Sequence, residues 1–97
     1  MTFQELYKIN TEHYVRELRW SPIQPSTLAV GLFDGRLIVH NQEETTQIAH
    51  KVSSERILCV EWNPQIEGKI AVGSFDSGVY LVTVDGKKCE SEKLVHH

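Results

Sequence analysis

Apolar and polar residues alternate over short stretches of the chain, and no window shows the spacing of an amphipathic helix over three turns. In Val15–Trp20, Leu18 and Trp20 share one face of the expected strand, and the charged residues between them take the other face. Leu28–Leu32 is a nearly continuous apolar run, which is typical of a strand covered on both faces. The pattern therefore predicts an all-β fold.

Nine strands are expected, separated by turn residues. A leading strand is predicted over Phe3–Ile9. Asp34-Gly35 predicts a two-residue hairpin turn of the type-I′ kind, and Asp76-Ser77-Gly78 predicts a three-residue turn. The remaining strands are expected at Val15–Trp20, Leu28–Leu32, Arg36–His40, Thr45–Ala49, Ile57–Trp62, Lys69–Ser74, Val79–Val84 and Lys88–Val95.

One stretch of the sequence occurs twice. Cys59–Asp76 aligns with Glu17–Asp34 at an offset of 42 residues, so that Trp62 falls opposite Trp20. Treating Ser77 as a one-residue insertion extends the alignment along the next strand. The other matched pairs are Pro22/Pro64, Ala29/Ala71, Val30/Val72, Gly31/Gly73, Phe33/Phe75, Asp34/Asp76, Gly35/Gly78, Leu37/Tyr80 and Val39/Val82. A period of about 40–45 residues with four short strands is the mark of a propeller blade.

The repeat divides the chain into two units within one small domain. We expect a single partial β-propeller domain over residues 1–97, with the extra strand at 3–9, blade one at about 13–50 and blade two at about 55–97. Each blade is predicted to be a four-stranded antiparallel meander. Propellers typically have about 4–8 blades, so the further blades are expected to come from a longer chain or from other copies. Phe3–Ile9 is expected to dock on the Val79–Val84 edge of another copy, or of the missing blades, displacing the weaker Lys88–Val95.

Charge and hydropathy narrow the class of partner. The chain carries a net charge of −3 with its Lys and Arg residues scattered, whereas a nucleic-acid-binding domain usually shows a basic patch. No apolar run approaches the roughly 18 residues needed to cross a bilayer, and the first residues do not resemble a signal peptide. Protein partners are therefore expected, with nucleic acid disfavoured and no membrane association.

The two cysteines predict a reducing compartment. Cys59 and Cys89 stand 30 positions apart and do not make a disulfide framework. Cys59 lies within an apolar strand and is predicted to be a small buried hydrophobic residue. An intracellular location, cytoplasmic or nuclear, is the resulting expectation.

The repeated unit resembles the WD40 repeat. Each unit has a strand ending in Trp-Ser-Pro or Trp-Asn-Pro, then an Ala-Val-Gly-x-Phe-Asp run, and then a strand of alternating aliphatic residues. His40-Asn41 and Thr83-Val84 stand where the family has its terminal Trp-Asp. The resemblance covers about residues 12–84 and implies a β-propeller.

The resemblance also implies a buried hydrogen-bond network in each unit. In the family, the turn Asp, the His of a Gly-His pair and a Trp of the third strand form this network. Carried over by position, Asp34 accepts a hydrogen bond from His13, and Asp76 accepts one from His50, although no glycine precedes either histidine. The tryptophan member is absent from both units. These four residues are expected to stabilise the turns.

No group of residues has the pattern of a catalytic or metal site. The histidines lack the H-x-x-x-H or H-x-H spacing of a zinc site, and no serine lies in a G-x-S-x-G motif. The turn aspartates are typical of residues that bond to their own backbone. We therefore expect no catalytic residue, no metal ligand, no cofactor and no enzymatic activity.

The resemblance implies a protein–protein interaction scaffold, because propellers of this family mostly hold peptides on their loops and rims. The expected role is to hold partners in a multiprotein complex. The alternatives are an RNA-associated propeller and a homo-oligomer that closes a ring by strand exchange. Arg16, Lys51 and Arg56 lie where the first strand of each unit begins, on a rim, and are the candidate partner contacts.

Two further predictions concern the contact between the units. Trp20 and Trp62 occupy the same place at a strand end, which indicates packing and not ligand stacking. Arg19 and Glu61 share one repeat position with opposite charge. If the units are neighbours, these two side chains are predicted to form an inter-blade ion pair that contributes less than about 1 kcal/mol.

Overall fold

The computed structural model describes residues 13–44 and 46–96, which lie in strands, turns and loops. The predicted leading strand Phe3–Ile9 lies outside these residues. The all-β prediction is confirmed, and each described strand overlaps the segment expected for it. The strands are β1 (Val15–Trp20), β2 (Thr27–Leu32), β3 (Arg36–Asn41), β4 (Thr46–Lys51), β5 (Ile57–Trp62), β6 (Lys69–Ser74), β7 (Gly78–Asp85) and β8 (Lys88–His96).

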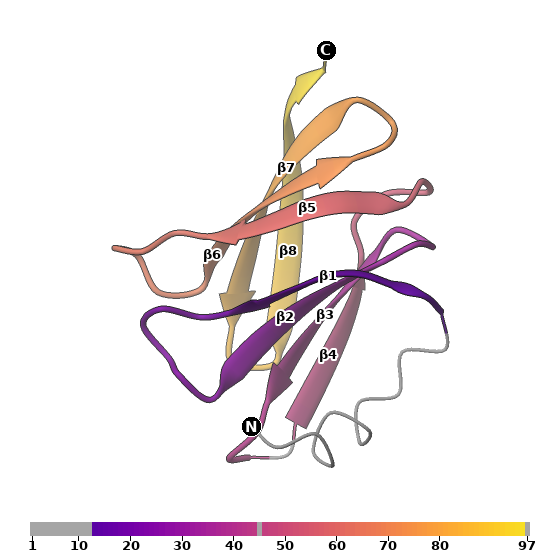
Figure 1. Ribbon diagram of the computed structural model, residues 1–97. Helices are drawn as coiled ribbons and strands as arrows, with labels where there is room; N and C mark the ends of the chain where they lie inside the picture. The colour runs from indigo at the N-terminus through magenta and orange to yellow at the C-terminus, as the bar shows by residue number, and fades with distance from the viewer. Residues whose placement is uncertain (1–12, 45, 97) are drawn as a thin grey trace.

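The strands form two four-stranded antiparallel meanders that lie side by side (Figure 1). Each sheet follows the chain order, β1-β2-β3-β4 in the first and β5-β6-β7-β8 in the second. β1 lies against β5, whereas β4 and β8 make little contact. Sheets that meet at their first strands and diverge toward their last ones are arranged as adjacent propeller blades. We call them blade one (β1–β4) and blade two (β5–β8).

The outer edge of β7 is already paired. β8 runs along it from Lys88, opposite Asp85, to His96, opposite Gly78. An incoming Phe3–Ile9 strand from another copy would therefore have to displace a complete ladder to reach this edge.

The repeat continues through the β2–β3 and β6–β7 turns without an insertion. The Gly35 N–H donates to the Leu32 carbonyl (3.3 Å) as the Ser77 N–H donates to the Ser74 carbonyl (3.1 Å). Positive φ occurs at Gly35 (89°) and Ser77 (71°), the third residue of each three-residue loop. Each loop is thus a tight turn followed by a left-handed residue. The predicted two-residue turn and the predicted insertion at Ser77 are both wrong, because Ser77 takes the conformation that glycine takes in blade one.

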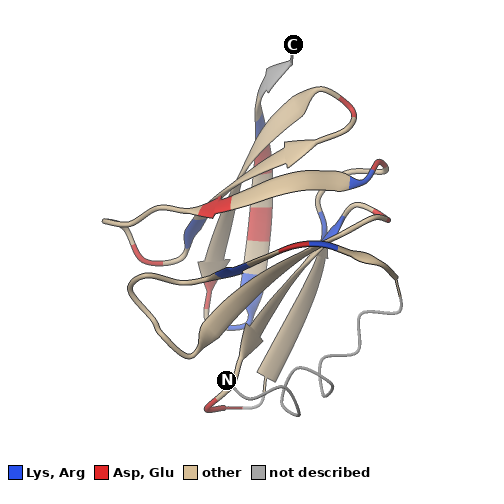
Figure 2. Cartoon of the chain, viewed as in Figure 1, with Lys and Arg blue, Asp and Glu red and all other residues tan. Residues whose placement is uncertain are grey.

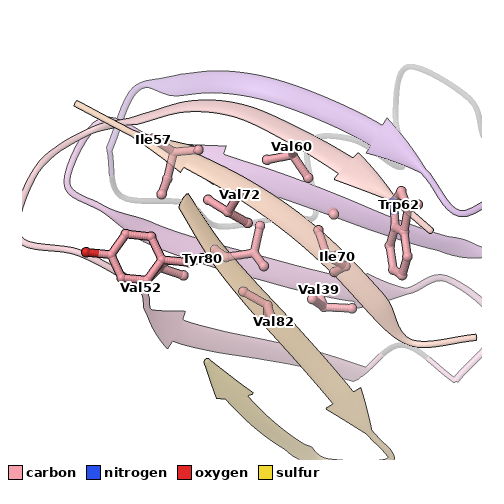
Figure 3. Packing of buried hydrophobic residues seen from close by; sticks show 11 residues of the cluster. Val39, Val52, Ile57, Val60, Trp62, Ile70, Val72, Tyr80 and Val82 are labelled. Carbon is pink, nitrogen blue, oxygen red and sulfur yellow. The ribbon is translucent and has the colours of Figure 1, made fainter. Parts of the chain in front are cut away.

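The main core lies between the two sheets (Figure 3). Blade two contributes most of it, including the indole of Trp62, which is 5% exposed. Blade one closes the other side with Ala29, Leu37 and Val39. Because side chains alternate along a strand, the opposite face of blade one carries a second, separate cluster. Its members are Leu28, Val30, Leu32 and Ile38.

Gly31 allows the two sheets to approach each other closely. A Cβ atom at this position would lie 2.7 Å from Cγ2 of Ile57 and 3.1 Å from Cγ2 of Val60. At the equivalent Gly73, an added Cβ would meet a single described atom, Sγ of Cys59, in its own sheet. The absence of a side chain therefore lets another blade pack at Gly31, whereas at Gly73 an added Cβ would meet only a side chain of its own sheet.

Candidate interaction surfaces

Two polar contacts join the blades at their first strands. The Glu17 carboxylate accepts a hydrogen bond from the Val60 N–H (2.8 Å), and the Trp62 indole N–H donates to the Arg19 carbonyl (2.9 Å). The guanidinium of Arg19 binds Glu17 on its own strand, with Nη2 2.6 Å from Oε1. The predicted ion pair between Arg19 and Glu61 is therefore wrong. We call this contact between β1 and β5 the seam. In each of its two polar contacts, a side chain of one strand bonds to a main-chain group of the other, and no pair of opposite charges is involved.

Asp76 accepts a network of hydrogen bonds in blade two. The Tyr80 hydroxyl (2.5 Å) and the Ser53 hydroxyl (3.0 Å) donate to Oδ2, and the Gly78 N–H donates to Oδ1 (2.7 Å). The Ser74 hydroxyl in turn donates to Ser53 Oγ (2.9 Å). The network ties the segment after β4 to the β6–β7 turn. Tyr80 takes the place that the WD40 resemblance gives to a third-strand tryptophan.

These contacts stabilise the ionised form of Asp76. The hydrogen bond from the Tyr80 hydroxyl has the largest effect on the pKa of Asp76, and partial burial opposes it. Together with hydrogen bonds from Gly78 and Ser53, it lowers this pKa to about 2. The network is thus built on an ionised carboxylate, which accepts hydrogen bonds from the turn and from the segment after β4.

The fold is expected to lose part of its stability in acid through this carboxyl group. A pKa that is lower in the folded chain than in the unfolded one stabilises the fold above about pH 4, and the contribution is lost as the pH falls toward about 2. In Tyr80→Phe the pKa of Asp76 should rise, so the acid-sensitive contribution should shrink by about 1 kcal/mol. Urea unfolding of both chains across this pH range measures the difference. Identical pH profiles would show that the Tyr80 hydroxyl does not hold the carboxylate.

Asp34 has a different set of partners. The Arg36 Nε (2.6 Å) and the Arg36 backbone N–H (3.1 Å) both donate to it, and His13 Nε2 lies 3.6 Å from its Oδ2. Partial burial raises the pKa of Asp34, but the hydrogen bonds and charge of Arg36, with the charge of His13, outweigh burial and lower the pKa below its ordinary value. The structure places His13 beside Asp34, with Arg36 as the closer partner.

His50 does not reach Asp76. Its Nε2 lies 2.8 Å from the Ser91 hydroxyl of β8. The predicted pair of His50 with Asp76 is therefore wrong. His13 precedes Asp34 by 21 residues, whereas His50 precedes Asp76 by 26, so the two histidines are not equivalent in the repeat.

On the outer face of blade one, the first strand is less covered than the matching strand of blade two. Three β1 residues on this face correspond to residues of β5 that are buried in the seam. They are 41–43% exposed, against 0–5% for their counterparts: Val15, Leu18 and Trp20, against Ile57, Val60 and Trp62. Leu28, Val30 and Leu32, which pair with these residues on the same face, are 0–1% exposed, so the exposure is confined to the β1 side of the face.

The outer face of blade two is open across more than its first strand. Ala71 and Val79 correspond to Ala29 and Leu37, which are fully buried under blade two. Ala71 is exposed, and Val79 is 37% exposed. The pair of blades thus ends on both sides in surfaces that match the two halves of its own seam.

Cys59 lies on this open face, so its predicted burial is wrong. The segment forms the expected strand, but Cys59 lies on the side of β5 that no described blade covers. Both thiols are free, Cys59 exposed and Cys89 half-buried, and burial raises the pKa of the Cys89 thiol to about 11.

The two thiols are expected to differ sharply in reactivity. An aromatic disulfide reagent at mildly alkaline pH should modify Cys59 at once, because the reactive thiolate is accessible there. Cys89 should react only as the chain unfolds. Ser in place of Cys59 should remove the fast phase alone. Two fast equivalents in the wild-type chain would contradict the burial of Cys89.

The three candidate partner contacts lie on the rim where β1 and β5 begin, and Figure 2 shows basic positions at the start of both strands. Lys51 Nζ donates to the Asp34 carbonyl in the β2–β3 turn. Arg56 lies over the Phe33 ring, with Cζ 6.0 Å from the ring centroid. Arg16 is the bulged residue of β1. The structure therefore brings Lys51 and Arg56 together around one turn and leaves Arg16 beside it on the strand.

A cleft of about 470 Å³ opens at the opposite rim, where the two blades diverge. The Gln24 amide donates to the Glu67 carboxylate and links the blades there. Among the described residues that line the cleft, the charged ones are all acidic: Glu44, Glu67 and Asp85.

The described residues do not assemble a chemical centre. Across residues 13–44 and 46–96, no three His, Cys, Asp or Glu side chains come together as a metal-binding group. Within the same ranges, no helix has the length and apolar character to cross a membrane. What the described part of the chain presents is a set of surfaces.

The fold, the seam and the open faces define the chain as blades of a WD40-type β-propeller, a class of protein-interaction scaffolds that are generally not enzymes. The chain belongs to the family described as the anaphase-promoting complex subunit 4 WD40 domain, whose family model matches residues 1–65. The match includes all of blade one and β5 of blade two. A search of curated proteins found no match.

Proposed function

We propose that the chain forms part of a WD40 propeller that holds protein partners within a multiprotein complex. The observation that carries this proposal is the seam, whose two halves recur on the outer faces, at the half-exposed β1 residues of blade one and at the exposed Ala71 and Val79 of blade two. Further blades on both sides would give the rigid ring that interaction propellers use as a platform. Since the family is named for a subunit of the anaphase-promoting complex, an assembly of this kind, in the cytoplasm or the nucleus, is the proposed setting.

Affinity purification of the full protein from its own cells, with quantitative mass spectrometry, tests the proposal. We expect subunits of one complex in fixed ratio to the chain, with recovery that is unchanged by ribonuclease. Recovery of RNA that is lost as salt is raised would favour the RNA-associated alternative and overturn the scaffold proposal. Recovery of the chain without other subunits would also overturn it.

A ring of three copies, with six blades, is the second candidate, and the match of the two outer faces to the halves of the seam favours it. If β1 of one copy packed on β5 of the next, Trp20 would meet the Glu61 backbone as Trp62 meets that of Arg19. Such a seam would lack one hydrogen bond, because Cys59 stands where Glu17 supplies its carboxylate. Sedimentation of the purified chain separates the candidates. A compact trimer would mean that copies of the chain close the ring, and a monomer would exclude this.

A further inference from the structure

Four side chains form a row along the rim that carries the β2–β3 and β6–β7 turns. They come from two pairs of repeat positions, Tyr14 with Arg56 and Phe33 with Phe75, each 42 residues apart. The Tyr14 and Phe33 ring centroids are 6.2 Å apart with the planes at 73°. The Arg56 Cζ lies 3.9 Å from the Phe75 centroid and 6.0 Å from the Phe33 centroid. This rim row therefore crosses the seam, with Arg56 between one phenyl ring from each blade.

The backbone holds the rim row in place. The Phe33 N–H donates to the Tyr14 carbonyl, and the Phe75 N–H donates to the Arg56 carbonyl, each at 3.0 Å. The turns require a left-handed residue at their third position, but their geometry does not require an aromatic residue at the first. Even so, Tyr14 is 81% exposed, Phe33 43% and Phe75 53%. Exposed aromatic side chains on a fixed backbone, next to an arginine, have the composition of an interface hot spot.

Arg56 brings unused hydrogen-bond donors to this row. Among the described residues, no carboxylate forms an ion pair with its guanidinium and no acceptor takes a hydrogen bond from it. The carboxylates next to the two phenylalanines are engaged elsewhere, Asp34 by Arg36 and Asp76 by Tyr80. A guanidinium stacked on a ring still offers its in-plane N–H groups, and their fork matches a carboxylate.

We infer that the rim row is the docking site for an acidic segment of a partner protein. An Asp or Glu carboxylate of that segment pairs with Arg56, and a neighbouring apolar side chain of the segment packs on Phe33 or Phe75. The inference rests on the proposed scaffold function and specifies the chemistry of the partner. A protein carboxylate is favoured over an RNA backbone, since the chain has a net charge of −3 and its Lys and Arg residues are scattered along the sequence.

Binding of a defined peptide to the full 97-residue chain tests the inference. The probe has two glutamates flanking a phenylalanine, and the control peptide has glutamines in their place. Titration followed by NMR should move the Arg56 side-chain N–H signal and the Phe75 amide signal. We expect about tenfold weaker binding for the glutamine peptide. Arg56→Gln should weaken binding of the glutamate peptide to about the same level.

Lys87→Gln is the charge control, because it removes one positive charge from the exposed β7–β8 turn, away from the rim row, and Lys87 has no described ring contact. It should leave binding within about twofold of the wild-type chain. If both variants weakened binding of the glutamate peptide equally, the loss would be due to net charge alone, and the inference would be overturned. Tighter binding of an oligouridine probe than of the glutamate peptide, lost in Arg56→Gln, would overturn it in favour of RNA.

The variants should fold, because Arg56 supports the β6–β7 turn through its carbonyl and not through its side chain. Phe75→Ala is a second variant at an exposed side chain, and it should also weaken the glutamate peptide severalfold. In the affinity purification, a wild-type chain that recovers no complex overturns the proposed function. A complex that is recovered equally by the wild-type and Arg56→Gln chains overturns the rim-row inference alone.

Discussion

Replacing Gly35 by serine is expected to destabilise the chain by about 3 kcal/mol or more, whereas Ser77→Gly is expected to stabilise it by at most about 1 kcal/mol. Both residues occupy the third position of the same turn with positive φ. At Gly35, an added Cβ would lie 1.9 Å from the Ser53 carbonyl oxygen and 2.6 Å from that of Glu55. These are backbone atoms, so a change of side-chain rotamer cannot relieve the overlap.

Urea unfolding of the two reciprocal variants measures this difference. Ser77→Gly relieves the cost of a left-handed side-chain-bearing residue but adds flexibility to the unfolded chain, so its net effect is small. A Gly35→Ser chain as stable as the wild type would mean that the segment 53–55 does not rest on this turn. The double variant should depart from additivity, because Ser53 contacts both turns, through its backbone N–H to Gly35 and through its hydroxyl to Asp76.

The contrast between the two turns follows from what packs on them. The Gly35 carbonyl accepts the N–H groups of Val52 (3.0 Å) and Ser53 (3.2 Å), so the segment leading into blade two wraps the turn of blade one. A loop that wrapped Ser77 in the same way would collide with its Cβ. A blade following blade two must therefore approach the β6–β7 turn along a different path.

The repeat in the sequence was sufficient to predict the architecture. Matched Trp-x-Pro and Ala-Val-Gly segments at one offset place corresponding strands in both units, and a period of this length leaves room for one four-stranded sheet each. The insertion predicted at Ser77 was wrong because the conformation of this turn residue was misjudged. Serine is uncommon at positive φ, so the glycine at position 78 was matched with Gly35, although Ser77 adopts that conformation.

The network at Asp76 could be predicted only in part. The resemblance pointed to the turn aspartate, but it assigned its partner by residue type, as His50, and not by repeat position. If the repeat offset of 42 residues is kept through the β6–β7 turn, Tyr80 is matched with Ile38. Tyr80 then lies beside Val72, on the face of blade two that packs against blade one. That offset was the signal that would have identified the hydroxyl donor.

The alternation of side chains along each strand could not predict which side chains are exposed to solvent. The pattern assigns Trp20 and Trp62 to the same face of equivalent strands, and it assigns Cys59 to the opposite face, but it does not say which faces are covered. That depends on how many blades stand beside each sheet. The rim row was missed for a related reason, since Phe33 and Phe75 were interpreted only as matched residues of the repeat.

The tryptophan pair gives the second large effect. Trp62→Ala is expected to destabilise the chain by about 3–5 kcal/mol, because it empties a buried site and leaves the Arg19 carbonyl without its donor. Trp20→Ala removes the same side chain from the same repeat position, but Trp20 is 41% exposed. Its expected cost in the isolated chain is about 1 kcal/mol or less. Thermal unfolding followed by circular dichroism compares the two variants without depending on tryptophan fluorescence.

Trp62→Phe separates packing from hydrogen bonding at the seam. Phenylalanine keeps much of the buried apolar surface and lacks the indole N–H, so this variant should lose about 1–2 kcal/mol, less than Trp62→Ala. The small cost expected for Trp20→Ala depends on the exposure of Trp20 on the outer face of blade one. In any assembly that places another blade against β1, Trp20 takes the buried role of Trp62, and Trp20→Ala should then become as costly as Trp62→Ala. Equal costs already in a monomeric chain would contradict the exposure of Trp20.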